Sequence, residues 1–282
     1  MGSKVLSGLL ERNAPLRVIA RTPVKLPAGI RDRAEIIEGS HGEASVVERA
    51  FKEPQPIWLA PLVDAEPGGD ADLDFTRPAA AALQRHQVAR IVTITAIGRG
   101  TAWQDQRGPV TASIRMDETA DGDRRSVSRP GRPSFMENTA RQAGATSEPA
   151  RSSFVADRQL PFTATRDMAA AAVRLLADTR WDGQQEAPLL GPDDLSFDDQ
   201  ATILSDVVGR PVRYQQISFD QFKQQSTGAP ASPWRRAMST CIGPRTRGFD
   251  NSVGRTPENT GPTHFCLFSQ MNLKALARPG EG

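Results

Sequence analysis

The sequence predicts an α/β protein in which a doubly wound parallel sheet is followed by a smaller lobe. Short β-rich runs alternate with helical stretches in the first half of the chain, which is the pattern of a parallel sheet covered by helices on both faces. Four such steps fall within about the first hundred residues. The chain has 282 residues, enough for one α/β domain with an appended lobe or for two modest domains, and we favour the first.

The elements of the first half follow in regular order. The chain opens with an amphipathic helix, and strands are then expected over 16–20, 34–39, 56–61 and 89–98. A helix is expected over 43–51, where Val46, Val47 and Ala50 share one face, and another from about 75 to 86. The run ARIVTITAIG over 89–98 is the most strand-like segment of the chain.

The middle of the chain gives weaker signals. A helix is expected from 108 to about 119, but 121–133 has few apolar residues where a further core strand is due, so it is a weak strand at best. A helix over 134–144 stops at a glycine, and 145–153 has the composition of a loop. We therefore expect a first domain over 1–145 and an interleaved, smaller C-terminal lobe over 146–282.

This C-terminal lobe is predicted to be of α+β type. It contains a helix over 164–178, a short strand over 186–192 and a strand over 211–217. Capping signatures at Ser196 to Asp199 and at Ser218 to Gln221 each begin a helix, the first of which runs to about residue 208. The region 227–263 is rich in Gly, Pro, Ser and Arg, and we expect a loop there with one short helix over 233–240.

Composition excludes several classes of protein. Lys and Arg together number 35 against 33 for Asp and Glu, and they are scattered, so nucleic-acid binding is not expected. No apolar run approaches the roughly 20 residues that cross a bilayer, so we expect no membrane partner. The two cysteines and three histidines match no metal-ligand spacing, and no metal is expected. The cysteine content fits a reducing cytoplasm.

Several phrases, spread over nearly the whole chain, carry a family resemblance. They are RVIARTP, VARIVTITAIG, RPSFMEN, PFTATRDMAAAAVRLL, LLGPDDLSFDDQATILSDVVGRPVRYQQIS and RTPENTGPT. In these phrases the chain resembles the NmrA-like branch of the atypical short-chain dehydrogenases. The resemblance implies a Rossmann-like domain with a small C-terminal lobe, and NADP or NAD bound across the carboxyl edge of the sheet.

The N-terminus departs from the family pattern. Family members start with an aliphatic strand and a GxTGxxG turn, whereas the first five residues here align only with the end of that motif, with Gly2 as its last glycine. The missing strand is central in the strand order 3-2-1-4-5-6, so its loss removes ladder partners from two neighbours and most of the phosphate-binding amides. We expect either that the flanking strands close the gap or that the sequence is a shortened version of a longer protein, with a truncated N-terminus.

The resemblance places the cofactor at the ends of successive strands. Arg21, assisted by Lys25, stands where a cation meets the 2′-phosphate of NADP, although a solvated arginine is the alternative. Ser40 stands where family members contact the adenine, and an ordinary glycine-flanked turn is the alternative. The hydroxyl of Thr95 is expected near the nicotinamide, unless backbone satisfies it. The other residues expected to line the cofactor are Ala60, Pro61, Ala96 and Gly98. NADP is the expected cofactor, with NAD possible.

The catalytic pair of other short-chain dehydrogenases, Tyr and a Lys four positions later, is absent. The one tyrosine is Tyr214, and position 218 is Ser. Arg115 and Glu118 occupy the helix where other family members place a polar pair and are candidates for donor and acid, the alternative being a solvated ion pair. Phe135, Met136 and Asn138 are expected to shape the substrate pocket, the alternative for the first two being core packing.

Two functions follow from these residues and the resemblance. The first is an NADPH-dependent reductase of small conjugated acceptors of quinone or azo type, with a weakened cofactor site. The second is a non-catalytic NAD(P)-sensing regulatory or interaction protein with the same fold. In either case we expect a small-molecule ligand and a monomer or homodimer.

Overall fold

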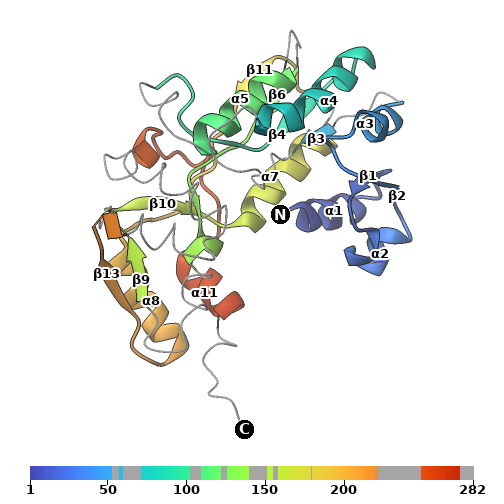
Figure 1. Ribbon diagram of the computed structural model, residues 1–282. Helices are drawn as coiled ribbons and strands as arrows, with labels where there is room; N and C mark the ends of the chain where they lie inside the picture. The colour runs from blue at the N-terminus through green and yellow to red at the C-terminus, as the bar shows by residue number, and fades with distance from the viewer. Residues whose placement is uncertain are drawn as a thin grey trace. The chain divides into compact units, whose positions relative to one another are not determined.

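A computed structural model of the chain describes the following residues (Figure 1): 1–52, 57–59, 71–101, 109–121, 126–139, 151–154, 158–178, 180–218, 220–221 and 249–273. The chain divides into two compact units. The first consists of 1–96, 110–131 and 168–187, and the second of 97–109, 132–167 and 188–282. The expected boundary at residue 145 lies outside the described residues. No helix in the described ranges is both long and apolar enough to cross a membrane.

Parallel strands form the centre of the first unit, which confirms the predicted fold class. β3 (Ile57–Leu59), β4 (Ile91–Thr93), β6 (Val127–Arg129) and β11 (Gln184–Glu186) make one sheet in the order β11-β6-β4-β3, and every pair in it is parallel. β1 (Arg17–Ala20) pairs in parallel with β2 (Glu35–Glu38) in a separate sheet. The helices are α1 (Gly2–Leu10), α2 (Ala28–Arg31), α3 (Ala44–Ala50), α4 (Ala71–Arg85), α5 (Pro109–Asp121) and most of α7 (Thr165–Ala177), with η1 (Pro23–Lys25) between β1 and α2.

The parallel ladder of this unit is therefore in two pieces. Among the strands that the structure describes, β1 bonds only to β2, and β3 bonds only to β4. The break falls where the family order places its first strand, between the two strands that β1 and β3 match. Closure of this gap by the flanking strands, one of the two expected outcomes, is not seen in the described part of the chain.

Apolar packing of α3 and α4 against the sheet forms the core of the first unit. Val47, Phe51, Leu83 and Ile91 belong to this core and are buried. Val46 is also buried and Ala50 packs against the cluster, so the apolar face predicted for this helix is confirmed. α4 begins four residues before its expected start, and the strand expected over 89–98 is divided into β4 and β5 (Thr95–Ala96).

The strand least expected from the sequence, β6, lies inside the larger sheet. The region 121–133 has few apolar residues, yet Val127, Ser128 and Arg129 are all buried. Two of these side chains have partners within the unit, because the hydroxyl of Ser128 accepts a hydrogen bond from Gln185 and the guanidinium of Arg129 pairs with Asp117. The prediction of a weak strand was wrong here because internal partners allow a polar strand to be buried.

The described residues of the second unit include two small sheets and two longer helices. β10 (Leu160–Thr163) pairs in parallel with β8 (Ser134–Phe135) and antiparallel with β12 (Asp194–Leu195). β9 (Arg151–Phe154) pairs in parallel with β13 (Arg213–Gln216). The helices are α8 (Phe197–Val208) and α11 (Phe265–Leu273), with η2 (Phe249–Asn251) before α11; one further short strand is β7 (Gly131–Arg132). The expected short helix over 233–240 lies outside the described residues.

Three expectations for this part of the chain are corrected. The predicted loop over 145–153 overlaps β9, whose pairing with the distant β13 leaves no local signal. The strand expected over 186–192 is displaced, because β11 ends at Glu186 and Leu190 makes only an isolated bridge to Thr260. The helix expected from residue 134 is preceded by β8, and helical structure begins at residue 136.

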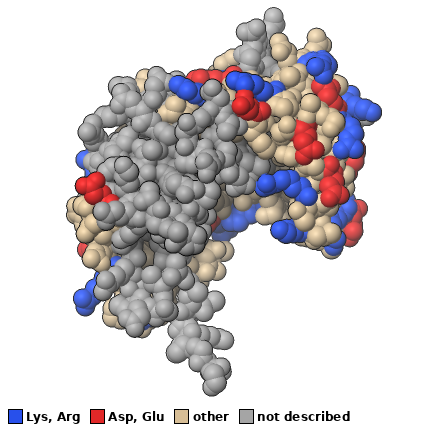
Figure 2. All heavy atoms as spheres, viewed as in Figure 1, with Lys and Arg blue, Asp and Glu red and all other residues tan. Residues whose placement is uncertain are grey.

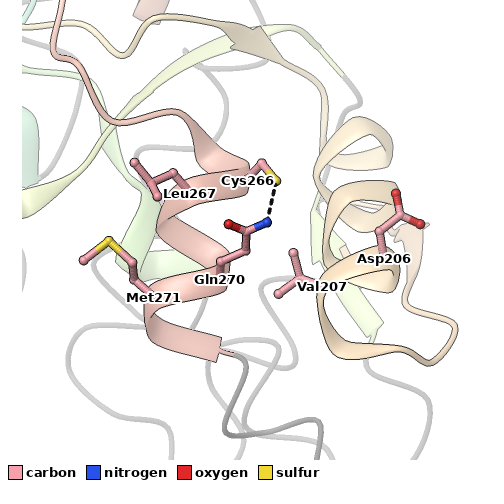
Figure 3. Close-up of a pocket in the computed structure, with 6 residues that line it drawn as sticks. All are labelled: Asp206, Val207, Cys266, Leu267, Gln270 and Met271. Atoms are coloured by element: carbon pink, nitrogen blue, oxygen red, sulfur yellow. Dashed lines mark hydrogen bonds between the residues drawn. The ribbon is translucent and has the colours of Figure 1, made fainter.

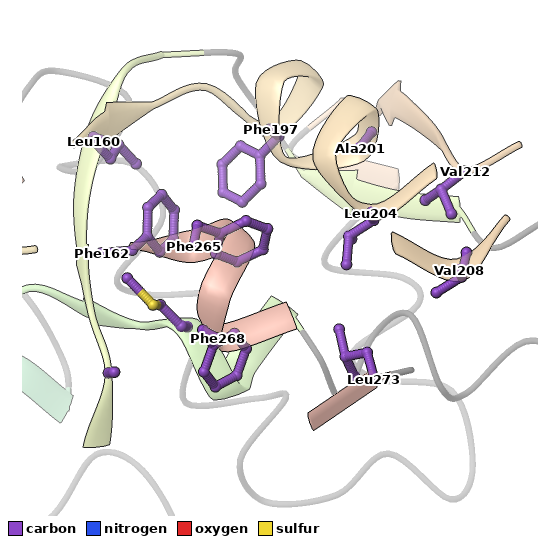
Figure 4. Close-up of a cluster of buried hydrophobic side chains, with 12 residues drawn as sticks. Leu160, Phe162, Phe197, Ala201, Leu204, Val208, Val212, Phe265, Phe268 and Leu273 are labelled. Atoms are coloured by element: carbon purple, nitrogen blue, oxygen red, sulfur yellow. The ribbon is translucent and has the colours of Figure 1, made fainter. Parts of the chain in front are cut away.

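Aromatic side chains from α8, α11 and β10 form the core of the second unit (Figure 4). The ring of Phe197 lies edge-on to Phe162, with centroids 5.8 Å apart, and stacks on Tyr214 at 5.7 Å. α8 begins with the predicted capping box, because Ser196 Oγ accepts from the Asp199 amide and Asp199 accepts from the Ser196 amide. Tyr214 therefore belongs to this packing, as its position on a strand predicted.

Close backbone approach at Gly191 gives a test of this core. A Cβ at Gly191 would lie 1.8 Å from the carbonyl oxygen of Phe162, which is part of β10 and has no room to move. We expect Gly191→Ala to lower the free energy of unfolding by roughly 3 kcal/mol, measured by urea denaturation. The control is Gly254→Ala, where a Cβ would meet nothing within 4 Å. Equal stability of the two variants would contradict this packing.

Candidate functional site

Arg21 and Ser40 lie at the carboxyl ends of two paired strands. β1 and β2 run in parallel with Ala20 opposite Glu38, and the Gly39 amide bonds to the Ala20 carbonyl at 3.2 Å. The residues that follow these two strands are therefore neighbours at one edge. Arg21 is exposed, as is Lys25 at the end of η1. Ligands of open α/β sheets bind at this carboxyl edge.

The segment GSHG after β2 forms a turn that begins α3. The Ser40 amide donates to Glu43 Oε1 at 3.1 Å, and Ser40 Oγ accepts from the Gly42 amide at 3.3 Å. The hydroxyl of Ser40 is thus engaged within the turn, and its predicted contact with the adenine stays a prediction. Glu43 is turned toward the backbone of the same segment.

His41, in this turn, is a residue whose importance sequence reasoning missed. Its ring is half-buried and lies 6.4 Å from the ring of Phe75 on α4, centroid to centroid. Burial and then the positive charge of Arg21 lower the pKa of His41. The available signal was its position directly after the strand that pairs with β1, because the carboxyl ends of parallel strands meet at one edge. Arg21 and His41, which we call the Arg21–His41 pair, are thus close enough to interact electrostatically.

Thr95 and Ala96 follow β4 in the core of the first unit. Both are buried, and the Thr95 amide donates to the Pro130 carbonyl at 3.2 Å. Gly98, in the second unit, adopts a φ of +109°, and its carbonyl accepts from Thr101 Oγ1 at 2.8 Å. Gly2 is the first residue of α1. Ala60 and Pro61 lie outside the described residues. The cofactor contacts of all these residues stay predictions.

α5 presents different residues to solvent and to the interior. Arg115 and Glu118 are exposed, so their predicted catalytic role has no support from burial and stays a prediction. Ser113 and Asp117, one turn apart on the buried side, are 2% and 4% exposed. The buried polar groups of this helix are therefore not the two that the family resemblance pointed to.

A buried ion-pair network joins α5 to the sheet. Arg129 Nε lies 3.1 Å from Asp117 Oδ2, and the two side chains are among the most buried charged groups of the described chain. The hydroxyl of Thr93, on β4, donates to Asp117 Oδ1. The guanidinium of Arg129 also donates to Gln184 Oε1 at 3.1 Å and faces Glu186 at 3.6 Å. This network connects β4, β6 and β11 through side chains as well as backbone.

The three residues predicted for the substrate pocket lie in the second unit. Met136 is 2% exposed and belongs to the aromatic core, which matches the alternative of core packing. Phe135 and Asn138 are half-buried. Glu137, between them, accepts from the Thr165 amide at 3.1 Å and from its hydroxyl, and so caps the start of α7. The pocket role of the three residues stays a prediction.

A pocket between α8 and α11 is a separate feature of the second unit (Figure 3). Its volume is about 570 Å³, and none of the predicted site residues lines it. The lining residues are Asp206, Val207, Cys266, Leu267, Gln270 and Met271. Gln270 Nε2 donates to Cys266 Sγ at 3.6 Å across one turn of α11.

Charged side chains of both signs share the face of the molecule seen in Figure 2. Basic and acidic side chains are interleaved on this face. The described part of the chain also holds no group of three or more His, Cys, Asp or Glu that would bind a metal ion.

Comparison with known proteins identifies the family. A family model described as NAD(P)H-binding matches residues 1–179, which is more than half of the chain, and the chain belongs to this family. The (4-alkanoyl-5-oxo-2,5-dihydrofuran-3-yl)methyl phosphate reductase of Streptomyces griseus is 29% identical over 218 residues, covering 76% of this chain and 73% of that protein.

Solved structures agree with this fold. An NADPH-dependent quinone oxidoreductase from Escherichia coli, in complex with NADPH, has a TM-score of 0.80 at 18% identity and covers 96% of this chain and 95% of its own. A Citrobacter triphenylmethane reductase, in complex with NADP(H), has a TM-score of 0.76 at 15% identity, with 96% of each chain covered. The fold of the chain is therefore the Rossmann-like NAD(P)-binding α/β fold.

The buried ion pair gives a stability test. Asp117→Asn removes the charge that compensates Arg129 and leaves a buried cation without its counterion, so we expect a loss of about 3 kcal/mol in the free energy of unfolding. Glu118→Gln makes the same chemical change at the next residue, which is exposed, and is expected to change stability by less than about 0.5 kcal/mol. Urea denaturation measures both. Loss of equal size in the two variants would refute the role assigned to Asp117.

Proposed function

We propose that the chain is an NADPH-dependent reductase of small conjugated acceptors, of quinone or azo type. The observation that carries the proposal is the Arg21–His41 pair at the carboxyl edge of β1 and β2, in a chain of the NAD(P)H-binding family. The 2′-phosphate of NADP carries up to two negative charges near neutral pH, whereas the 2′-hydroxyl of NAD carries none. The Arg21 charge, beside an imidazole that a bound phosphate would favour in its protonated form, therefore favours NADP over NAD.

Residues 21–30, which follow β1, contain no carboxylate, and Glu38, the last residue of β2, stands opposite Ala20. A carboxylate that binds the ribose of NAD would be expected close to the end of β1. The carboxylate in the turn after β2, Glu43, instead accepts a hydrogen bond from the Ser40 amide. The buried, unpartnered hydroxyl of Thr95 at the end of β4 is a second feature that fits a dinucleotide.

Bound NADPH would supply a hydride to the acceptor. The chain lacks the Tyr and Lys pair of other short-chain dehydrogenases, so an acceptor that takes its proton from water suits it best. The relatives named as reductases of a furanone phosphate, a quinone and a triphenylmethane dye support a reductase acting on a conjugated small molecule. We also propose that the protein acts in the cytoplasm, as a monomer or homodimer, without nucleic-acid or membrane partners.

Cofactor binding tests the proposal directly. Arg21→Gln removes the guanidinium charge of the Arg21–His41 pair and is expected to raise the Kd of NADPH by roughly 10- to 100-fold, with little effect on NADH, because a charge-assisted hydrogen bond contributes about 1.5–3 kcal/mol. Arg31→Gln, which changes an exposed arginine at the end of α2, is the matched control. Isothermal titration calorimetry measures the Kd of NADPH and of NADH for the unaltered chain and for both variants. Absence of NADPH binding to the unaltered chain at millimolar concentration would refute the proposal.

Turnover separates the reductase from the alternative, a protein that senses NAD(P) without catalysis. If the chain is a reductase, NADPH absorbance at 340 nm will fall when menadione or an azo dye is added. Binding of NADPH without its consumption, over a panel of such acceptors, would favour the sensor. The Kd values of NADPH and NADH are measured without an acceptor, so they do not depend on the outcome of this turnover assay.

The protonation of His41 gives an independent prediction. Arg21 at the end of β1 and the Phe75 ring on α4 face His41, and burial and the arginine charge place its pKa below 6.5 in the unliganded protein. A bound 2′-phosphate would favour the protonated ring, so adenosine 2′,5′-bisphosphate should raise the pKa of His41, whereas adenosine 5′-phosphate should not. With three histidines in the chain, NMR titration of the imidazole protons resolves this shift. Equal pKa values with both nucleotides would count against a 2′-phosphate contact.

The same lowered pKa affects stability. The unfolded chain binds a proton at His41 more readily than the folded chain does, so protonation favours unfolding. The contribution is therefore present above about pH 6.5 and is lost as the pH falls through that value toward the folded-state pKa. We expect His41→Gln to reduce the loss of thermal stability between pH 7.5 and pH 5.5, relative to the unaltered chain.

A further inference from the structure

Two buried hydroxyl groups in the first unit have no hydrogen-bond partner among the described residues. They are Thr95 Oγ1 and Ser113 Oγ, on residues that are 1% and 2% exposed. A buried hydroxyl without a partner costs stability, so most such groups in native proteins are satisfied. Two such groups, one shortly after β4 and one on α5, close in sequence to the Thr93 and Asp117 hydrogen bond, call for an explanation.

The geometry of the chain places the two hydroxyls opposite each other. Thr93 and Thr95 are two residues apart, so they lie on the same face of the extended segment. Ser113 and Asp117 are four residues apart and lie on the same face of α5. The Thr93 hydroxyl donates to Asp117, which fixes these two faces against each other.

The direction of α5 relative to β4 indicates which residue of the helix lies opposite Thr95. Because β4 and β6 are parallel, the helix that connects them runs antiparallel to both. Two residues forward along the strand advance about 6.6 Å, and four residues backward along the helix advance about 6 Å in the same direction. From this arithmetic we infer that Thr95 stands opposite Ser113, as Thr93 stands opposite Asp117.

Their position is at the carboxyl end of the strand, where ligands of this fold bind. On the other side the Asp117 and Arg129 ion pair closes the space, and the Thr95 amide is already bonded to Pro130. Among the described residues of α5 and of the segment 91–96, these two hydroxyls are the buried side-chain groups without a hydrogen-bond partner, and each can donate one hydrogen bond. Two converging donors match an atom with two lone pairs, which is the character of a carbonyl oxygen.

We propose that Thr95 and Ser113 together bind a carbonyl oxygen of the cofactor and acceptor pair, an inference that rests on the proposed function. The carbonyl belongs either to the carboxamide of the nicotinamide or to a quinone-type acceptor. In both cases the hydroxyls orient the reacting rings at the end of β4. Ser113 is thereby a binding residue on the helix where Arg115 and Glu118 are exposed.

The experiment compares Thr95→Val and Ser113→Ala with Thr93→Val. Thr95→Val and Thr93→Val make the same change two residues apart, but Thr93→Val removes the hydrogen bond that Asp117 accepts from the Thr93 hydroxyl. We expect the thermal midpoint of Thr93→Val to fall, and the midpoints of the two test variants to stay level or rise, because an unpartnered hydroxyl is removed. This readout is independent of activity and shows that the test variants fold.

Binding and turnover then identify which carbonyl is bound. If it is the carboxamide, both test variants raise the Kd of NADPH by roughly 10-fold or more, while the Kd of adenosine 2′,5′-bisphosphate, which has no nicotinamide, is unchanged. If it is the acceptor, the Kd of NADPH is unchanged and kcat/KM for menadione falls roughly 10- to 100-fold, with no such fall for methyl orange, an azo dye without a carbonyl group. Either result supports the proposal.

Other outcomes overturn it. Test variants that keep the Kd of NADPH and kcat/KM for menadione within about twofold of the unaltered chain would show that the hydroxyls hold ordered water or are simply tolerated. A fall in the thermal midpoint equal to that of Thr93→Val would show that they have structural partners. Failure of the unaltered chain to bind NADPH would remove the proposed function and this site together, whereas the first two outcomes remove the site alone.

Discussion

The ion pair between Asp117 and Arg129 is the constraint on which the larger sheet depends. β6 is an inner strand with a polar sequence, and its arginine is buried between β4 and β11. Such a strand is tolerated only if the guanidinium has a counterion and the surrounding hydrogen bonds are made. Asp117 supplies the counterion and accepts a hydrogen bond from Thr93. Gln184 accepts a hydrogen bond from the Arg129 guanidinium, and Glu186 faces it. The order of strands at the carboxyl edge, and so the position of Thr95, follows from this arrangement.

The parts of the fold with apolar periodicity could be predicted from the sequence. The runs around Ile19 and Ile37, the apolar face of α3 and the capping box of α8 all appear where residue pattern and local hydrogen bonding placed them. The failures have different physical causes. β6 carries buried polar residues whose partners are distant in sequence, and β9 is specified by β13 rather than by its own residues. No helix was expected over 265–273, because α11 exposes Leu267 and Met271 while burying Phe265 and Phe268, so it has no distinct apolar stripe.

The residues of the candidate site likewise divide into those that the sequence could indicate and those that depend on contacts between distant segments. Arg21 could be placed after a strand from the sequence alone, because strand ends are local features. The importance of His41 depends on β1 and β2 being parallel neighbours, and that of Ser113 depends on the direction and face of α5. Residue type alone could not indicate either residue as part of a site, since a histidine in a turn and a serine in a helix are both common in solvated positions. Spatial pairing, and not composition, is what distinguishes them.

The division of the parallel ladder has a mechanical consequence. The strands that end at Arg21 and at the turn containing His41 share no backbone ladder with the larger sheet in the described part of the chain. Side-chain packing of α3, which contacts β1, β2 and α4, links the two sheets instead. Such packing is weaker and less directional than a ladder, so the two-stranded sheet can open with a lower free energy than the four-stranded one. Amide protons of β1 and β2 would then exchange with solvent faster than those of β4 and β6.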